Sequence, residues 1–360
     1  MRASLGRVGV FGMGLLGGSV ALGLRERFLV DEVHAYDPDP QAIETALAVG
    51  AAQVGHTSLG PWVSSLDAGL LAAPVGALVD LGRAVAPLAA PGSFWTDVGG
   101  VKTEIVHALH GVLPGFVGGH PMAGSERAGV AHAHASMLEN AVWVLTPHAE
   151  TPWGHVSRVK QLVDGLGAFP MVLDPALHDR LVARVSHLPY LLAVALTLLV
   201  GTDRDAEQLM FLAAGGFRDL TRVASGSPRM SRDMVAANRG PLKEALGDLR
   251  AQLERLDALL DEPDFLLERA QEAKETRDAL PVVRRSLLPR MYDVVIAVPD
   301  RPGELARITS ALGEAQVNIK DIEVLTIRAE GEAIRLGFAT PEERQAARDA
   351  LTDQGYEVAS

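Results

Sequence analysis

A glycine-rich motif near the start of the chain carries the clearest chemistry in the sequence. Gly12-Met13-Gly14-Leu15-Leu16-Gly17 follows a predicted strand that ends at Phe11, and it opens a predicted helix. In such a motif the first glycine permits a tight turn, the second lets the backbone approach a pyrophosphate, and the third lets helix and strand pack closely. The exposed N–H groups at the start of the helix bind the phosphates. The motif therefore predicts a dinucleotide-binding site.

An acidic residue indicates which dinucleotide binds. Asp37 lies twenty residues after Gly17, at the end of the second predicted strand. A carboxylate at that place accepts a hydrogen bond from a ribose 2′-hydroxyl and repels a 2′-phosphate. The alternative is a merely structural glycine turn, but strand, helix and acid all stand where a cofactor site needs them. We therefore expect NAD rather than NADP.

The first half of the chain alternates short apolar runs with helical segments, which is the pattern of a parallel sheet wrapped by helices. Strands that are covered on both faces read as nearly continuous apolar runs. We expect an α/β, Rossmann-like domain over residues 1–175. Its predicted strands are Val8–Phe11, Val33–Tyr36, Gly69–Ala73, Phe94–Thr96, Phe116–Gly118, Val142–Leu145 and Met171–Leu173.

Helical periodicity replaces the strand signals after about Pro175 and predicts an all-helical domain over residues 176–288. Leucines from Leu242 to Leu260 recur at spacings of four and three, which is typical of helix-on-helix packing. This leucine stripe either belongs to an intramolecular core or forms the seam of a dimer. The apolar run Leu188–Val200 is too short for a helix to span about 30 Å of hydrocarbon. We interpret it as a buried core helix.

The last part of the chain, residues 289–360, predicts a βαββαβ unit of the ferredoxin-like type. A Pro-Asp-Arg-Pro-Gly turn at 299–303 separates its first strand from its first helix. The expected elements are strands over Tyr292–Val298, Val317–Ile327, Ile334–Ala339 and near Glu357, and helices over Glu304–Glu314 and Glu342–Asp353.

Five motifs, in order along the chain, resemble the prephenate dehydrogenase family. They are Gly14–Val20, Thr96–Lys102 (TDVGGVK), Gly118–Glu126 (GGHPMAGSE), Ser186–Pro189 (SHLP) and Gly215–Arg222 (GGFRDLTR). The resemblance covers about the first 285 residues. It implies NAD-dependent oxidative decarboxylation of prephenate to 4-hydroxyphenylpyruvate, on the route to tyrosine. In that reaction a hydride leaves the ring carbon that carries the hydroxyl group.

The resemblance implies three catalytic residues. His120 stands at a predicted strand end before Pro121, and as a neutral imidazole it would accept the hydroxyl proton. The alternative for His120 is a buried histidine satisfied by the backbone. Lys102 would lie near the nicotinamide or the substrate, with a solvated lysine as the alternative. Glu126 would be a gating or orienting acid near the mouth of the pocket.

The same resemblance implies a set of substrate-binding residues. Arg222 matches a position that grips a carboxylate, a role that suits a planar and permanently charged guanidinium. Asp219 would orient Arg222 or the motif backbone, and Gly215 opens the same motif. A surface ion pair is the alternative for Arg222 and Asp219. His187 and Tyr190 would line the same pocket.

Two segments of the last domain, Val298–Leu305 and Val317-Asn318-Ile319, look like ACT domain signatures. ACT domains bind small amino acids between paired domains near a glycine turn, where Gly303 would let the backbone approach a ligand closely. The resemblance thus implies an effector site at Gly303, Asn318 and Ile319, in a homodimer. Tyrosine, the product of the pathway, is the first effector to test. The alternative is a dimerisation module without a ligand.

The bulk composition excludes several classes of protein. Hydrophobic residues make up 48% of the chain and charged residues 22%, as in an ordinary globular protein. A net charge of -12 argues against nucleic-acid or anionic-membrane partners. Cysteine is absent and no signal peptide is recognisable, so we expect a soluble cytoplasmic protein. His132 and His134 lack a recognisable metal-ligand pattern, so no metal is expected, and His107 and His110 are interpreted as exposed helix residues.

Three other functions are alternatives. An arogenate dehydrogenase of the same family is the nearest, because Gly100 stands where the family commonly has serine and Tyr190 where it commonly has a second histidine. A β-hydroxyacid dehydrogenase would share the glycine turn, but the motifs of His120 and Arg222 speak against it. A catalytically silent amino-acid sensor would lose the site chemistry, whereas His120, Arg222 and Asp37 are all present.

Overall fold

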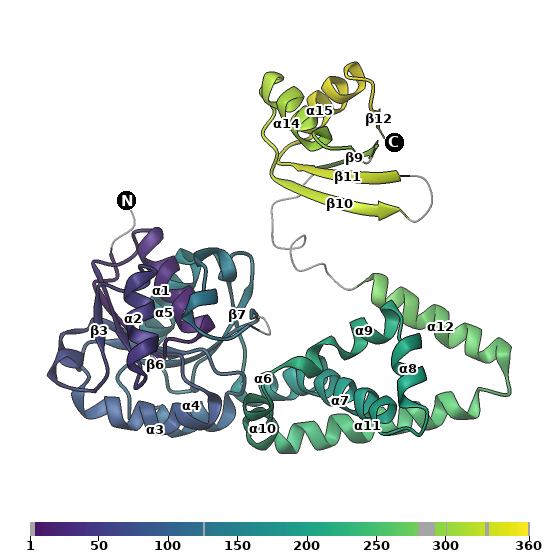
Figure 1. Cartoon of the computed structure of the whole chain (residues 1–360). Coiled ribbons are helices and arrows are strands. Elements are labelled where there is room, and N and C mark those ends of the chain that lie inside the picture. Colours follow the sequence, from purple (N-terminus) through teal and green to yellow (C-terminus); the bar gives the residue numbers. More distant parts are fainter. Residues whose placement is uncertain (1–3, 125–126, 280–291, 300, 328–330, 359–360) are drawn as a thin grey trace. The chain divides into compact units, whose positions relative to one another are not determined.

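The computed structural model describes residues 4–124, 127–279, 292–299, 301–327 and 331–358 (Figure 1). These residues form two compact units, Met1–Thr276 and Arg277–Ser360. The first unit contains a large sheet and most of the described helices, and the described part of the second contains a small sheet with the helices α14 and α15.

An eight-stranded sheet in the order β3-β2-β1-β4-β5-β6-β7-β8 forms the centre of the first unit. Neighbouring strands pair in parallel except for β6 and β7. The expected Rossmann-like fold is confirmed. The strands are β1 (Arg7–Phe11), β2 (Glu32–Tyr36), β3 (Val54–His56), β4 (Ala68–Leu71), β5 (Phe94–Asp97), β6 (Phe116–Pro121), β7 (Val142–Thr146) and β8 (Phe169–Val172).

Helices cover both faces of this sheet, as the apolar strands require. One buried cluster packs under α1 and α5 and includes Val10, Leu24 and Trp143. The other packs under α3 and α4 and includes Trp95 and Leu109. The helices and 3₁₀ turns of this region are α1 (Leu15–Glu26), α2 (Pro40–Ala48), η1 (Pro61–Ser65), α3 (Val75–Val85), η2 (Ala86–Leu88), α4 (Thr103–Leu109), η3 (Val130–His132), η4 (Ala135–Leu138) and α5 (Trp153–Gly165).

The sheet differs from the sequence expectation at two places. β7 runs antiparallel to β6, because the described residues that connect them form only the short turns η3 and η4, which pack on α1 and do not cross the sheet. A parallel pair would need a crossover connection, usually a helix. The strand β3 was not expected, since a run of three residues is too short to show a period.

The rest of the first unit is helical, as expected for the second domain. Several of its helices begin with proline, which suits the first helical position because its missing N–H is not needed there. The elements are α6 (Pro175–Val182), η5 (Ala183–His187, a π-helical turn), α7 (Leu188–Gly201), α8 (Ala206–Leu212), α9 (Gly215–Thr221), η6 (Arg222–Ser225), α10 (Pro228–Ala237), α11 (Arg239–Ala258) and α12 (Pro263–Asp278).

The apolar helix α7 is not the buried core helix that its sequence predicts. Ala193 is its buried residue, while Leu198 and Leu199 are 58% and 69% exposed. The leucine stripe of α11, which runs beside α7 (Figure 1), is buried at Leu242 but exposed at Leu253. Exposed apolar stripes on adjacent helices favour an interface with another chain over an internal core.

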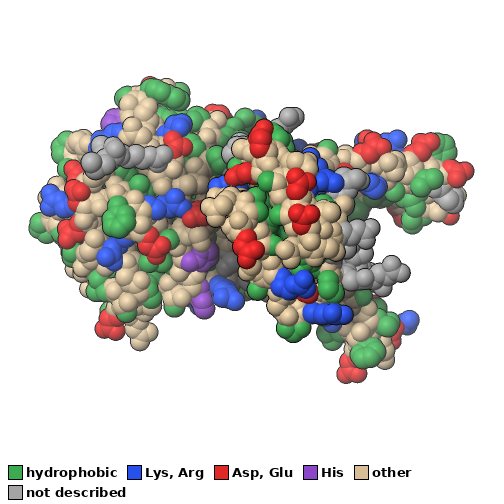
Figure 2. All heavy atoms as spheres, turned by 90° about the horizontal axis from the view of Figure 1, so that it is seen from above, with side chains coloured by type: hydrophobic (Ala, Val, Ile, Leu, Met, Phe, Trp, Pro, Cys, Tyr) green, Lys and Arg blue, Asp and Glu red, His purple; other side chains and the backbone are tan. Residues whose placement is uncertain are grey.

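The helical run Pro175–Gly201 is also long and apolar enough, by length and composition alone, to cross a membrane. Its first part holds His178, Asp179 and His187 buried within the protein. The remaining α7 is about 21 Å long at 1.5 Å per residue, against about 30 Å of hydrocarbon. This division argues against a membrane span. On the face drawn in Figure 2, the described Lys and Arg side chains lie among acidic ones and form no continuous basic surface.

The second unit has the expected βαββαβ order, with an antiparallel sheet in the order β10-β11-β9-β12. Ile308, Leu312, Phe338 and Leu351 fill its core. The second strand begins later than expected, because Val317 closes the end of the preceding helix through a bond to the carbonyl of Leu312. The elements are β9 (Tyr292–Val298), α14 (Glu304–Glu314), β10 (Asp321–Ile327), β11 (Gly331–Phe338), α15 (Pro341–Asp353) and β12 (Glu357–Val358).

Candidate active site

The glycine motif between β1 and α1 has the geometry of a phosphate-binding turn. Gly12 adopts φ +107°, a backbone conformation that favours glycine. A Cβ on Gly17 would lie 2.0 Å from the carbonyl oxygen of Gly12, so this close approach excludes any side chain. A Cβ on Gly14, the residue before α1, would meet nothing within 4 Å. The motif is therefore tight where helix meets strand and open where a phosphate would lie.

The carboxylate of Asp37 binds the backbone of this turn. One carboxylate oxygen accepts a hydrogen bond from the N–H of Met13 at 2.8 Å, and the other accepts from the N–H of Asp39 at 3.0 Å. Each oxygen keeps a further lone pair for a ribose hydroxyl. The described residues therefore fit a dinucleotide whose ribose lies against Asp37 and whose phosphates lie over Gly14.

His120 lies at the same edge of the sheet as this turn. The strands β1, β4, β5 and β6 are parallel, so their carboxyl ends meet at one edge, where open α/β sheets bind ligands. His120 is the fifth residue of β6 and is half-buried. A Cβ on Gly100, which follows β5, would lie 3.7 Å from Nε2 of His120. Nε2 thus faces a space that the missing side chain leaves open.

A buried ion pair fixes the backbone beside His120. Lys102 and Asp97 are both fully buried and joined by an ion pair. The Lys102 ammonium also donates to the carbonyl of Gly119 at 2.9 Å, and the Asp97 carboxylate accepts from the N–H of Gly119 at 2.9 Å. Burial lowers the pKa of Lys102, and the attraction of Asp97 opposes that change. The sequence predicted Lys102 near the nicotinamide or the substrate. In the structure its ammonium group binds the backbone of Gly119, the residue before His120.

Asp179, on α6, ties the helical domain to this region. Its carboxylate accepts hydrogen bonds from the N–H groups of Lys102 and Thr103, both at 2.8 Å. These groups open α4 and would otherwise lack partners. Burial would raise the pKa of Asp179, but hydrogen bonds from His178 and Thr103 outweigh it and lower the pKa. The carboxylate is therefore ionised at neutral pH.

His178 connects this carboxylate to His120. Its Nδ1 lies 2.8 Å from Asp179 Oδ1, and its Nε2 lies 2.9 Å from Nδ1 of His120. The two imidazole rings meet edge to face, with centroids 5.1 Å apart. Burial, followed by the electrostatic effects of His178 and Lys102, holds the pKa of His120 well below its usual value. His120 is accordingly a neutral imidazole at neutral pH, which is the form that accepts a proton.

A second buried histidine, His187, belongs to the same cluster. Its Nδ1 lies 3.0 Å from the side-chain nitrogen of Asn238, which also donates to the carbonyl of Asp179 at 2.8 Å. Burial lowers the pKa of His187 to about 4, although Asp179 opposes the change. A π-helical turn, a feature often found at functional sites, ends at His187. Tyr190 follows one helical turn later and is half-buried.

The other expected substrate residues are exposed in this single chain. Gly215 and Asp219 are exposed on α9, which packs against α7 and lies away from the sheet (Figure 1). Arg222 is exposed at the start of η6. The structure thus brings together His120, Lys102 and His187 in one cluster.

Two further sets of expected residues give no complete site. Glu126 lies outside the described residues. In the second unit, Gly303 precedes α14 with φ +94°, and Asn318 is exposed before β10, while Ile319 packs against the core. The left-handed backbone at Gly303 is a conformation that favours glycine.

One group of side chains has ligand atoms close enough together for a metal ion. Nitrogen or oxygen atoms of His110, His148 and Glu150 lie within 4.8 Å of one another. The two imidazole rings are stacked with centroids 3.7 Å apart, so their in-plane lone pairs run side by side and do not converge on one point. The group also lies at the opposite edge of the sheet from His120, since it surrounds the start of β6 and the end of β7.

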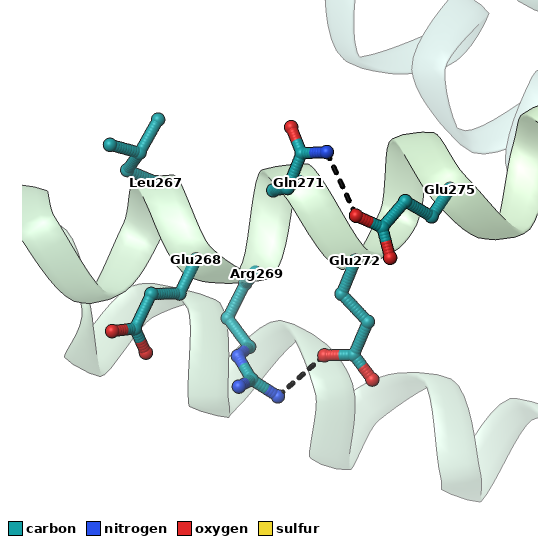
Figure 3. A pocket seen from close by; sticks show the side chains of 6 residues that line it. All are labelled: Leu267, Glu268, Arg269, Gln271, Glu272 and Glu275. Carbon is teal, nitrogen blue, oxygen red and sulfur yellow. Dashed lines mark hydrogen bonds and ion pairs between the residues drawn. The ribbon is translucent and has the colours of Figure 1, made fainter.

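A surface hollow in Figure 3 is unrelated to the cluster around His120. Its lining comes from α12 alone, where Arg269 pairs with Glu272 and Gln271 bonds to Glu275. Side chains of a single helix leave no enclosed space for a substrate.

Four residues of the cluster were not expected from the sequence: Asp97, His178, Asp179 and Asn238. A signal for two of them exists, since adjacent His178 and Asp179 stand on a predicted helix shortly before His187. Polar residues on the inner face of an apolar helix are usually paired when buried. Asp97 and Asn238 have no comparable signal.

Comparisons with known proteins give a domain match for each part of the chain. Residues 20–172 match the model of the prephenate dehydrogenase nucleotide-binding domain, 174–270 that of the prephenate dehydrogenase dimerization domain, and 292–353 that of the ACT domain. The chain is 31% identical to prephenate dehydrogenase of Bacillus subtilis, with 94% of each chain covered. The expected domain boundaries stay predictions, and the second of them falls within residues 280–291, outside the described residues.

Two solved structures are similar to the first unit. One is prephenate dehydrogenase from Aquifex aeolicus in complex with hydroxyphenyl propionate and NAD+, with a TM-score of 0.73 and 31% identity, covering 77% of this chain and 99% of that one. The other is Synechocystis arogenate dehydrogenase, with a TM-score of 0.67 and 29% identity, covering 76% of this chain and 99% of that one.

The glycine motif gives a prediction with a matched control. Gly17→Ala pushes a methyl group into the carbonyl of Gly12 and should lower the free energy of unfolding by about 1–3 kcal/mol. Gly14→Ala meets no atom and should leave stability within about 0.5 kcal/mol, yet weaken NAD binding. Denaturant unfolding and titration with NAD separate the two effects. Unchanged NAD affinity in Gly14→Ala would show that the phosphates do not lie over this residue.

The buried ion pair gives a second prediction. Lys102→Met keeps the volume but leaves the Asp97 carboxylate buried without its cation, which should lower the free energy of unfolding by about 3–5 kcal/mol. Lys160→Met is the control, because Lys160 pairs with Asp164 on the exposed face of α5, and it should change stability by less than about 1 kcal/mol. Urea denaturation checks both variants. Similar small losses in the two would contradict the pairing of Lys102.

Proposed function

The chain belongs to the prephenate dehydrogenase family, and we propose that it oxidises prephenate with NAD to 4-hydroxyphenylpyruvate and carbon dioxide. The observation that carries the proposal is the neutral His120, held at the same edge of the sheet as the glycine turn with Nε2 facing open space. Prephenate dehydrogenases need one group that accepts a proton from the ring hydroxyl as a hydride leaves the same carbon.

The cofactor in this proposal is NAD, which supplies the acceptor for the hydride when it is bound. Gly14 and the start of α1 would hold its phosphates. Asp37 would accept from the ribose hydroxyls and repel the 2′-phosphate of NADP. The similar prephenate dehydrogenase from Aquifex aeolicus was solved in complex with NAD+, which supports this assignment.

His120 acts as the base through Nε2. As the hydride leaves, positive charge develops on the hydroxyl oxygen, and transfer of its proton to Nε2 removes that charge. Loss of the substrate carboxylate as carbon dioxide then makes the ring aromatic, and the ring oxygen regains a proton. Lys102 and Asp97 keep the backbone next to His120 in place during this exchange.

The substrate carries two carboxylates, and we assign Arg222 to one of them. A guanidinium forms bidentate hydrogen bonds with a carboxylate. Asp219 and Gly215 would shape the same region, His187 and Tyr190 would line the pocket, and Glu126 would stand at its mouth.

We further assign the chain to a homodimer. The family model over residues 174–270 describes a dimerization domain, and the described part of that region exposes Leu198, Leu199 and Leu253. A second copy would cover these side chains. A cytoplasmic location stays a prediction.

Arogenate is the second candidate substrate. It carries an amino group where prephenate has a keto oxygen, so its ring hydroxyl and carboxylates need the same partners. Gly100 and Tyr190 depart from the usual residues of the family, and Synechocystis arogenate dehydrogenase is among the similar structures.

The ACT domain supports regulation, and we propose tyrosine as the effector, bound near Gly303, Asn318 and Ile319.

A single set of assays tests the function. NADH formation is measured from prephenate and from arogenate, each with NAD and with NADP, in the presence and absence of tyrosine. We expect efficient turnover of prephenate with NAD, little with NADP because of Asp37, and inhibition by tyrosine that is lost when residues after Pro289 are removed. Faster turnover of arogenate than of prephenate would show that arogenate is the substrate. Equal catalytic efficiency with NAD and NADP would contradict the role of Asp37.

The base is tested by His120→Asn, which keeps a polar side chain without a usable proton acceptor. Loss of a general base typically lowers the rate by about 10² to 10⁴, and substrate affinity should change less. In the native enzyme kcat should fall only as the pH drops through the lowered pKa of His120, well below the usual histidine range. A variant that turns over within a few-fold of the native rate, with the same acid limb, would contradict the assignment.

A further inference from the structure

Hydrogen bonds to Asp179 determine which nitrogen of His178 carries a proton. The carboxylate already accepts from two backbone N–H groups and lies 2.8 Å from Nδ1 of His178. An ionised carboxylate only accepts hydrogen bonds. Nδ1 of His178 must therefore be the donor. In a neutral imidazole the other nitrogen, Nε2, then carries the lone pair.

The lone pair on Nε2 of His178 determines which nitrogen of His120 carries a proton. Nε2 of His178 lies 2.9 Å from Nδ1 of His120, and two lone pairs cannot share a hydrogen bond. Nδ1 of His120 is therefore protonated and donates to His178. The lone pair of a neutral His120 is left on Nε2, the nitrogen that faces the space beside Gly100.

A separate contact sets the tautomer of His187 in the opposite sense. The backbone carbonyl of Asp179 only accepts, so the group of Asn238 that faces it at 2.8 Å must be the NH₂. The same NH₂ lies 3.0 Å from Nδ1 of His187 and donates its second proton there. Nδ1 of His187 is thus the acceptor, and the proton of the neutral ring lies on Nε2.

We propose that His178, Asp179 and Asn238 are positioning residues that hold His120 and His187 in opposite tautomers. His120 then presents a proton acceptor at Nε2, and His187 presents a proton donor at Nε2. The proposal deepens the proposed function, since it rests on His120 as the base.

Opposite tautomers suit a substrate that offers both a hydroxyl proton and anionic oxygens. A base must have its lone pair toward the hydroxyl, whereas a group that holds a carboxylate or keto oxygen must donate. Asp179 determines both tautomers. Its carboxylate contacts His178, which bonds to His120, and its backbone carbonyl contacts Asn238, which bonds to His187. In serine proteases the wrong tautomer, produced by exchanging the orienting aspartate for asparagine, lowers kcat by about 10⁴.

The first test compares two substitutions of His178. Gln can accept from His120 with its oxygen and donate to Asp179 with its nitrogen, so His178→Gln should keep kcat within about tenfold. His178→Leu offers neither group and should lower kcat by about 10² or more, with a small change in KM. The side-chain NH₂ of Asp179→Asn can donate to Nδ1 of His178, which would reverse the direction of the hydrogen bonds from residue 179 to His120. We therefore expect kcat to fall by about 10² to 10⁴.

The second measurement reads the tautomers without turnover. NMR of the full-length protein with ¹⁵N-labelled histidine shows which ring nitrogen carries a proton, and His120→Asn and His187→Asn assign the signals. We expect Nδ1–H for His120 and Nε2–H for His187 in the native protein. Asp179→Asn should move His120 toward Nε2–H, whereas Asn238→Leu should alter His187 and leave His120 unchanged.

These outcomes separate the positioning role from the function itself. A native His120 protonated at Nε2, or kcat and tautomers that stay unchanged in His178→Leu and Asp179→Asn, would overturn the proposal. If the native protein oxidises neither prephenate nor arogenate, the proposed function fails, while the NMR signals still decide the positioning role. If Asp179→Asn does not fold because α4 loses its cap, the two His178 variants carry the test.

Discussion

The carboxylate of Asp179 is the contact on which the rest of the site depends. It caps the first N–H groups of α4, it accepts from His178, and it stands on α6, the first helix of the helical domain. Hydrogen bonds to a charged group contribute about 1.5–3 kcal/mol each, so this side chain joins the two domains of the first unit at one point. The same bonds make it ionised, and an ionised carboxylate can only accept. The carboxylate that joins the two domains is therefore also the group that determines which nitrogens of the histidines carry protons.

The pair of Lys102 and Asp97 has a different role from the one expected for a catalytic lysine. Two charges removed from water are seldom a net gain in stability, because desolvation offsets most of their attraction. Their value here is geometric: between them they bind both the N–H and the carbonyl of Gly119. The position of His120 is therefore set by the end of β5 as well as by its own strand. The Asp97 carboxylate also accepts from the N–H of Gly99 at 2.8 Å, so the same pair holds the turn that follows β5.

The helical domain exposes apolar side chains on two adjacent helices. α7 is the most apolar of the described helices, yet it leaves Leu198 and Leu199 exposed. On the adjacent α11, Leu253 and Leu256 are also exposed. An internal core of this size would be expected to bury such a stripe. The dimerization domain that this region matches explains the pattern.

The sequence by itself determined most of the elements, though not the short strand β3, and several of the residues with intrinsic chemistry. The spacing of Gly12 to Gly17, the place of Asp37 and the motif of His120 depend on local backbone geometry, and local geometry is encoded in neighbouring residues. The βαββαβ unit followed from periodicity in the same way. The sequence did not determine the direction of β7, the exposure of α7, or the pairing of His120 with His178, which is 58 residues away. These depend on how distant segments pack, and tertiary packing alone decides which nitrogen of a histidine is left free to react.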